Sequence, residues 1–450
     1  MTFRTKMLGL EGYAGAGIGF EDAEIEMAPE GEELVQSVQE TTELQGEVTN
    51  DLATVERLEQ SAAGLEDIAA INEGAVAEAT DGELALTEVA ADLATVGTDI
   101  EGAEEMVPAL ESYKGKRISM EGIKDTAKQI WAAIKAFMKK IWEKIVAFWR
   151  RITDQVPSVV KAAKKLQARA EATRGKTLKE KGDKTSISSS EGHALLIDDK
   201  KATGFADLSK GLDALKATND AVLSEHANRV KAAGDFIAGK LEKFDLDKPE
   251  DSLAALNSSV KQVMKKALKS INISVTGDKR FGSDMEVTRS EHLFGNRAVF
   301  LTQIKESSGG TALGVAQNLR SMSCTLTASK EKLKEHTGEF EISTLNPSDC
   351  EKLADQIIDN MEVLKKFQSK ARRDLETGAT AVSAGGDKIE KKPDDKTSAN
   401  AIKHYQAALQ YGSVYAKWCA SPFMSLLSHT LASSRTIISV ANKSLSQYKA

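Results

Sequence analysis

One stretch of the chain, GIKDTAKQIWAAIKAFMKKIWEKIVAFWRRITDQVP at residues 122–157, repeats its apolar residues more regularly than any other. These residues recur every three or four positions, the spacing that lines one face of an α-helix. The sequence therefore predicts a long amphipathic helix, which Pro157 should end or bend. Its apolar stripe consists of Ile123, Ile130, Trp131, Ile134, Met138, Ile141, Trp142, Ile145, Phe148, Trp149 and Ile152.

The composition of the chain extends this prediction to the whole fold. Proline is scarce, with 7 residues in 450, and aromatic residues make up only 5% of the chain. Alanine, leucine, glutamate and lysine are abundant, and these residues favour long helices over a sandwich or barrel. We expect a mainly α protein with an acidic helical pro-segment at 1–121, a long amphipathic basic helix with its tail at 122–184, and a helix-dominated body at 185–450 with a small β-sheet insertion.

Local patterns give the expected organisation of the body. Helical periodicity runs over residues 204–244 and 251–269, and again over the last fifty residues, with a break near Pro422. Ser348 has capping-box spacing to Glu351 and should open a helix that runs through Leu375. The β-branched segments at 271–276, 297–304 and 340–344 predict a small sheet within 271–344. The Ser-rich segment TSISSSEG at 185–192 is expected to be a linker, and residues 377–400 a flexible loop.

The charge of the chain changes sign at the start of the basic helix. Residues 1–121 hold 28 acids and 6 bases, so their net charge is −22, whereas the rest of the chain carries +15. Most of the positive charge is local, because residues 122–184 hold 17 bases and 6 acids, a net of +11. An acidic segment joined to a basic helix is typical of a pro-segment or arm attached to a region that approaches a polyanion.

The amphipathic helix is open to three interpretations. Its apolar stripe can pack into the protein or an oligomer, it can lie in a membrane surface, or its basic face can neutralise nucleic-acid phosphates. No base-reading motif accompanies it, so any contact with double-stranded DNA should be non-specific. The residues predicted to make the DNA or membrane contact are Lys128, Lys135, Lys139, Lys140, Lys144, Arg150 and Arg151.

The tripeptide Ser119-Met120-Glu121 lies where the acidic segment meets the basic helix. It sits in ESYKGKRISMEG, a stretch that a protease could bind in an extended conformation. The pattern small residue, any residue, glutamate recurs upstream, for example at residues 9–11, 64–66 and 109–111. The tripeptide is either a chance sequence at a domain joint or a processing site, and its location between the acidic segment and the basic helix favours processing.

The sequence disfavours an enzyme. The six histidines are scattered without metal-ligand spacing, and there is no nucleophile-elbow motif. The three cysteines are far apart and odd in number, which indicates a reducing compartment rather than a disulfide framework. No cofactor and no metal is expected, and no run of 18 uncharged apolar residues predicts a membrane-spanning helix.

Taken together, several segments resemble the internal head proteins of the giant phiKZ-like tailed phages. These are the acidic N-terminal segment, the Ser119-Met120-Glu121 junction, the Trp/Lys helix that follows, and the later motifs HALLIDD at 193–199 and HLFGNRAVF at 292–300. The Ala/Tyr/Ser-rich helical C-terminus is also similar to that family. The resemblance covers most of the chain, and none of its motifs is catalytic.

The resemblance implies a virion structural protein packed inside the capsid, as an internal head or inner body component associated with DNA packaging. It also implies an acidic propeptide that the phage's prohead protease removes after a small-x-Glu motif, here Ser119, Met120 and Glu121, which leaves Gly122 as the new N-terminus. The expected partners are other internal head proteins, the prohead protease, non-specific double-stranded DNA and a homo- or hetero-oligomer, with assembly in the bacterial host cytoplasm. The alternative is a membrane-active protein, released or ejected during infection, whose amphipathic helix binds a membrane surface.

Overall fold

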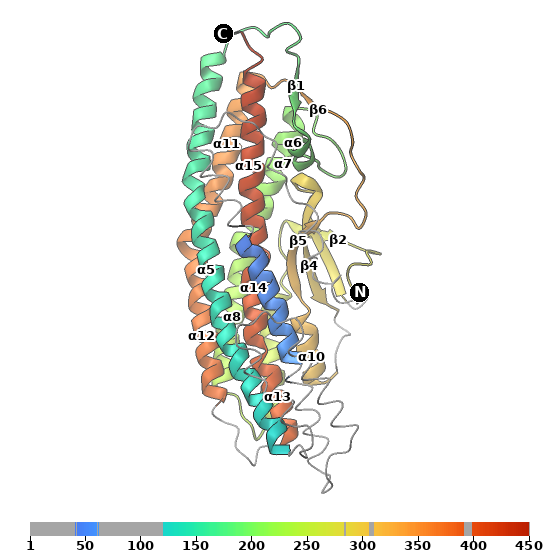
Figure 1. The fold of residues 1–450 in the computed structure, drawn as a ribbon. Helices are drawn as coiled ribbons and strands as arrows, with labels where there is room; N and C mark the ends of the chain where they lie inside the picture. Colours follow the sequence, from blue (N-terminus) through green and yellow to red (C-terminus); the bar gives the residue numbers. More distant parts are fainter. Residues whose placement is uncertain are drawn as a thin grey trace, which may run out of the picture.

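The fold is organised around one very long helix, α5 (Met120–Thr173), which runs along almost the whole molecule in Figure 1. The structure is a computed structural model, and it describes residues 41, 43–60, 62, 120–282, 285–305, 310–390 and 398–449. Helix α5 packs lengthwise against α11 (Pro347–Lys366) and α15 (Phe423–Leu445). The apolar stripe predicted from the sequence therefore faces other helices of the same chain.

The remaining helices form a bundle with these three. A π-helical turn, η3 (Ala221–His226), joins α7 (Phe205–Asp220) to α8 (Ala227–Glu242), so the helical pattern predicted over 204–244 is confirmed. A second π-helical turn, η5 (Phe367–Ala371), joins α11 to α12 (Arg372–Glu390), which packs along α8. The other helices are α6 (Ser189–Ala194), α9 (Pro249–Met264), α10 (Ala312–Arg320), α13 (Ala399–Leu409) and α14 (Tyr411–Ala420).

Two small antiparallel sheets lie on one side of the bundle (Figure 1). The larger sheet has the order β2 (Ile271–Ser274), β3 (Met285–Ser290), β4 (Arg297–Ile304) and β5 (Ser323–Ala328). The smaller sheet pairs β1 (Lys184–Ile187) with β6 (Phe340–Ser343). Together with a helical content of 68%, this confirms the mainly α fold with a small sheet.

The hydrophobic core is continuous from α5 to the large sheet. One cluster of buried apolar side chains includes Phe148 and Trp149 of α5, Phe423 of α15 and Leu301 of β4. A second, small cluster of Val287, Ala298 and Phe300 covers the other face of the sheet. Strand β4 is therefore buried on both faces, which explains why its sequence, RAVFLTQI, is almost continuously apolar.

Several local expectations are wrong, and each has a physical reason. Of the two outcomes expected at Pro157, an end of the helix is wrong, because α5 continues for sixteen residues beyond it. The expected linker at 185–192 is strand β1 followed by α6, whose N-terminus is closed by a capping box of Ser188 and Glu191. Glu191 also accepts hydrogen bonds from Ser439 and Lys443 of α15, so tertiary contacts order this polar segment.

The predicted flexible loop at 377–400 is also wrong in its first part. Residues 377–390 belong to α12, which buries Val382 and packs along α8. Residues 391–397 lie outside the described residues, and α13 begins at Ala399. The helix expected from Ser348 begins instead at Pro347, with Asn346 as the N-cap whose Oδ1 accepts the backbone N–H of Asp349 at 2.8 Å. The division of the chain into domains at residues 121 and 184 stays a prediction.

Candidate functional site

The apolar stripe of α5 is buried inside the protein over its described side chains. Ile141, Ile145, Phe148 and Trp149 are fully buried, and Trp142 packs its ring against Trp149 and against Tyr415 of α14. The side chains of Ile123 and Ile130 lie outside the described residues. The first interpretation of the helix, packing into the protein, therefore holds for this stretch. The membrane-active alternative stays a prediction.

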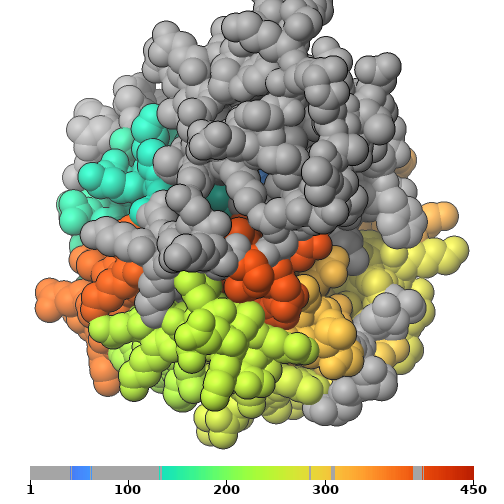
Figure 2. All heavy atoms as spheres, turned by 90° about the horizontal axis from the view of Figure 1, so that it is seen from below, coloured from blue at the N-terminus to red at the C-terminus, as the bar shows by residue number. Residues whose placement is uncertain are grey.

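Two of the predicted contact lysines are held in ion pairs with other parts of the chain. The Nζ of Lys135 lies 2.6 Å from Asp387 Oδ1 of α12, at the end of the molecule where Figure 2 shows the start of α5 (teal) beside α12 (orange). The Nζ of Lys144 lies 2.7 Å from Asp51 Oδ2 and 3.0 Å from Glu47 Oε2. Burial alone would lower the pKa of Lys144, but the hydrogen bonds to the two carboxylates outweigh it and raise the pKa.

The other described side chains that were predicted to contact DNA or a membrane lie on the exposed surface of α5. Lys139, Lys140, Arg150 and Arg151 are exposed, and the side chain of Lys128 lies outside the described residues. Helical geometry spreads these groups over the half of α5 that does not face the core. They do not form a single cluster, because Lys139 and Arg150 are three helical turns apart.

A basic groove lies farther along the same helix, between α5 and α11, and has a cavity volume of about 650 Å³. Val156, Pro157 and Val160 contribute apolar surface to it. We call it the α5–α11 groove. Its charged lining residues are Lys161, Lys164 and Lys165 of α5 and Glu362 and Lys365 of α11.

The sequence predicted the basic residues that α5 contributes to this groove, but not those that α11 contributes. The sequence predicts a basic tail after the helix, whereas in the structure residues 158–173 belong to α5. The contribution of Lys365 depends on the packing of α11 against α5, which brings together residues about 200 positions apart. A charge pattern on one helix does not identify the helix that packs beside it.

The proposed processing site lies at the beginning of α5. Met120, Glu121 and Gly122 form the first turn of the helix, while Ser119 lies outside the described residues, as do the side chains of the other three. The first turn of a helix lacks intrahelical partners for its N–H groups and frays readily. A protease could therefore obtain an extended substrate there without unfolding the buried part of α5.

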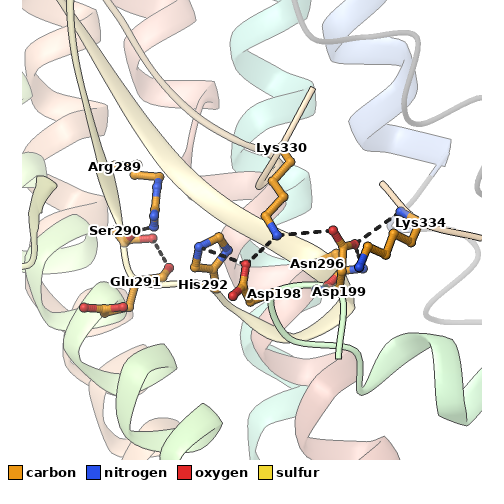
Figure 3. Close-up of polar contacts among 9 residues, drawn as sticks. All are labelled: Asp198, Asp199, Arg289, Ser290, Glu291, His292, Asn296, Lys330 and Lys334. Atoms are coloured by element: carbon orange, nitrogen blue, oxygen red, sulfur yellow. Dashed lines mark hydrogen bonds and ion pairs between the residues drawn. The ribbon is translucent and has the colours of Figure 1, made fainter. Parts of the chain in front are cut away.

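The two motifs HALLIDD and HLFGNRAVF meet in one polar cluster (Figure 3). The backbone N–H of Asp199 donates to Asn296 Oδ1 at 2.8 Å, and Asn296 Nδ2 donates back to Asp199 Oδ1 at 3.0 Å. Lys330 Nζ lies 2.7 Å from Asp198 Oδ1 and 3.2 Å from Asp199 Oδ2. The hydrogen bond from Lys330 lowers the pKa of Asp198. The cluster joins the loop after α6 to the start of β4 and acts as a structural brace.

The chemistry of the interior is that of a packed core. Burial lowers the pKa of His226 and of His429 to about 3, so both imidazoles are neutral, and the His226 ring stacks on Phe423. Burial raises the pKa of Cys324 to about 12, which keeps this thiol protonated and unreactive. Across the described ranges, no three His, Cys, Asp or Glu side chains are grouped to hold a metal ion, and no helix is long and apolar enough to cross a membrane.

Comparison with known proteins identifies the family. The model of the phiKZ-like phage internal head proteins matches residues 21–443, which is most of the chain. Neither the curated proteins nor the solved structures gave a match. The matched range includes residues 21–121 of the acidic segment, the whole of α5 and the cluster in which the two sequence motifs meet. The chain therefore belongs to the phiKZ-like phage internal head proteins.

Proposed function

We propose that the chain is the precursor of an internal head protein that is cut after Glu121 and then contacts packaged DNA through the basic surface of α5. The family consists of internal head proteins, so the chain is a structural protein of the virion and lies inside the capsid. Membership of a structural family also supports a role without catalysis. The prohead protease, the other internal head proteins of the inner body and an oligomeric state belong to the proposal as expected partners.

The observation that carries the DNA contact is the α5–α11 groove. Four lysines and one glutamate line it, and the lysines that it takes from α5 are exposed at positions 161, 164 and 165. Residues three or four apart on a helix lie about 5–6 Å from one another, which allows adjacent cations to contact neighbouring phosphates. Cations that neutralise phosphates release counterions, and this contribution does not depend on base sequence. The groove therefore suits the backbone of double-stranded DNA.

The charge of the precursor supports a cut at Glu121. Removal of residues 1–121 would change the net charge from −7 to +15, so a chain that is repelled by DNA would become one that is attracted to it. The candidate site lies at the first turn of α5, where a cut leaves the buried part of that helix intact. Before the cut, the acidic segment would reduce premature binding to DNA during head assembly.

The groove is tested on the chain cut after Glu121, by measuring how its DNA affinity depends on salt. The triple variant Lys161→Gln, Lys164→Gln and Lys165→Gln should bind a random-sequence duplex more weakly, because three phosphate contacts are lost. The slope of log K against log[salt] should become shallower by about 2.7, at about 0.9 for each contact. Fluorescence anisotropy of a labelled duplex, titrated at several salt concentrations, gives this slope.

A matched control separates the groove from overall charge. Lys243, Lys266 and Lys332 are exposed lysines of the body, none of them in the groove, and their replacement by glutamine removes the same total charge. This control should leave most of the salt slope unchanged. Equal losses in the two triple variants would contradict a contact at the groove, and equal affinity of the groove variant and the unmodified chain would do the same.

A further inference from the structure

Part of the acidic segment is a structural element of the body. Residues 41–62, drawn in blue in Figure 1, include a helix whose apolar residues recur every three or four positions. Val48, Val55, Leu58 and Ala62 are at most 6% exposed and belong to the main hydrophobic cluster. Burial of this extent is typical of a core helix, and short isolated helices are marginal in water.

The surface that receives this helix is built by three elements that lie after the proposed cut. Helix α5 contributes Lys144, which pairs with Glu47 and Asp51. Nearer the C-terminal end of the segment, Glu59 is buried near Arg320 of α10 and near Ser413 and Lys417 of α14. We call this the acceptor surface; it consists of these parts of α5, α10 and α14.

The charges of the two partners are complementary. Residues 41–62 contain five acids and one base, so the segment carries a net charge of −4. On the acceptor surface, Lys144 pairs with Glu47 and Asp51, and Arg320 and Lys417 partly offset the burial of Glu59. Because these groups lie beside a buried apolar strip, the surface has the properties of a binding site for an acidic amphipathic helix.

We propose that the acceptor surface binds residues 41–62 independently of the peptide connection, so that this segment stays bound after the chain is cut between residues 62 and 122. None of the contacts above uses the connection between the segment and α5. The consequence for maturation rests on the proposed cut after Glu121. That cut would produce a two-chain protein, in which a piece of the propeptide remains as a non-covalent part of the fold.

A cut at a chosen position tests the inference without the phage protease. The full chain is prepared with the recognition sequence of a site-specific protease inserted after residue 90, cut to completion, and passed through a size-exclusion column in 150 mM salt. Mass spectrometry of the denatured body peak then shows which pieces it contains. We expect the fragment with residues 41–62 to elute with the body, whereas elution as a separate peptide would overturn the proposal.

Variants in the segment show whether residues 41–62 hold the fragment. Val55→Asp places a carboxylate at a position that is 0% exposed, and it should release the fragment while α5 and the body stay folded. Glu56→Gln, an exposed position on the same helix, should retain the fragment and serves as the control. Retention of the Val55→Asp fragment would overturn the proposal, because other residues would then hold it.

If Val55→Asp prevents folding of the full chain, a peptide exchange experiment gives the same answer. A fluorescent synthetic peptide of residues 41–62 is added to the cut, unmodified protein, and its anisotropy should rise to saturation as it replaces the bound fragment. No rise on prolonged incubation, even above the unfolding midpoint followed by slow cooling, would contradict the proposal. Failure of this experiment leaves the DNA contact of the groove unaffected, and failure of the salt titration leaves the docking unaffected.

Discussion

Asn296 is the residue on which the brace between the two sequence motifs depends most directly. It exchanges two hydrogen bonds with the buried Asp199, and its backbone has a φ of 54°, in the left-handed region that asparagine tolerates better than most residues. Its own N–H donates to the carbonyl of Leu196 at 3.0 Å. One side chain thus stabilises both a strained turn and a buried carboxylate.

Replacement of Asn296 by alanine should lower the free energy of unfolding by about 2–4 kcal/mol. The variant loses the amide that pairs with Asp199 and places a less suitable residue at a positive φ. Lys334→Ala is the control, because Lys334 contributes only its backbone N–H to Asp199 and is exposed. Chemical denaturation monitored by circular dichroism compares the two variants, and equal midpoints would contradict the role of the brace.

Glu59 gives the docking of residues 41–62 a specific dependence on pH. Burial raises its pKa from 4.5 to about 7, while Ser413, Arg320 and Lys417 act in the opposite direction and Glu56 adds to the rise. Because the pKa of Glu59 is higher in the docked state than in the free segment, the protonated form of Glu59 favours docking. This contribution to the free energy of docking is fully present below pH 4.5 and is lost as the pH rises through 7. Docking should therefore weaken by about two orders of magnitude across this range and then level off.

The pH dependence is measured with the cut protein and the labelled peptide of residues 41–62. The dissociation constant should rise between pH 5 and pH 7 and stay nearly constant from pH 7.5 to pH 8.5. A peptide with Glu59→Gln should bind with little dependence on pH, and at pH 8 it should bind more tightly than the unmodified peptide. A flat profile for the unmodified peptide would show that Glu59 is not buried on docking.

At the scale of single elements, Pro157 in the middle of α5 is the clearest departure from what the sequence favours. Proline has no N–H to donate to the carbonyl of Thr153, and it disfavours a helix interior by about 3 kcal/mol relative to alanine. The helix continues because it is packed on both sides of the proline. Before it, Trp142 and Trp149 contact the rings of Tyr415 and Phe367. After it, Gln167 and Arg169 donate hydrogen bonds to Asp355 of α11 and Asn442 of α15. Tertiary contacts of this extent outweigh a local preference.

Replacement of Pro157 by alanine should therefore raise the free energy of unfolding by about 1–3 kcal/mol. Pro347→Ala is the matched control, because Pro347 lies in the first turn of α11, where a missing N–H costs nothing. The control should leave stability unchanged or lower it slightly. A loss of stability in Pro157→Ala would mean that the proline favours the local shape of α5 and the groove beside it.

Local patterns predicted many of these elements but not their partners. The apolar period of α5 and the continuous run of β4 are strong signals, and both elements occur where the sequence indicated. Strands β3 and β5 were missed because MEVTRS and SCTLTA are mostly polar and gain their order from pairing with β4. The helix over 377–390 was missed because its Gly- and Ala-rich sequence packs closely against α8, where Gly385 faces Leu241 and the backbone of Ala238.

The sequence predicted which types of residue form the candidate site, but not how they are arranged in space. The sequence correctly placed a basic helix after the acidic segment. It could not show that Lys144 forms ion pairs with Glu47 and Asp51, or that Lys135 forms an ion pair with Asp387. It also treated residues 1–121 as one acidic unit. The structure shows that residues 41–62 belong to the hydrophobic core, a distinction that depends on which face of that helix meets the body.

At the scale of the whole molecule, the proposed cut would change the charge of the protein while its helical core stays in place. Helix α5 takes part in both proposals, because its first turn contains the proposed cut and its C-terminal third lines the basic groove. Among the described side chains of α5, the buried ones begin at Trp131, ten residues after the proposed cut. Maturation would therefore change the surface and the connectivity of the protein while its described fold is retained.

The most direct test of this account is to determine the N-terminus and intact mass of the protein extracted from purified phage particles. The account predicts a main chain that begins at Gly122, and the inference about docking adds a second peptide that contains residues 41–62. A main chain without that peptide would support the cut and contradict the docking. A protein that begins at Met1 or Thr2 in the mature particle would contradict the proposed processing.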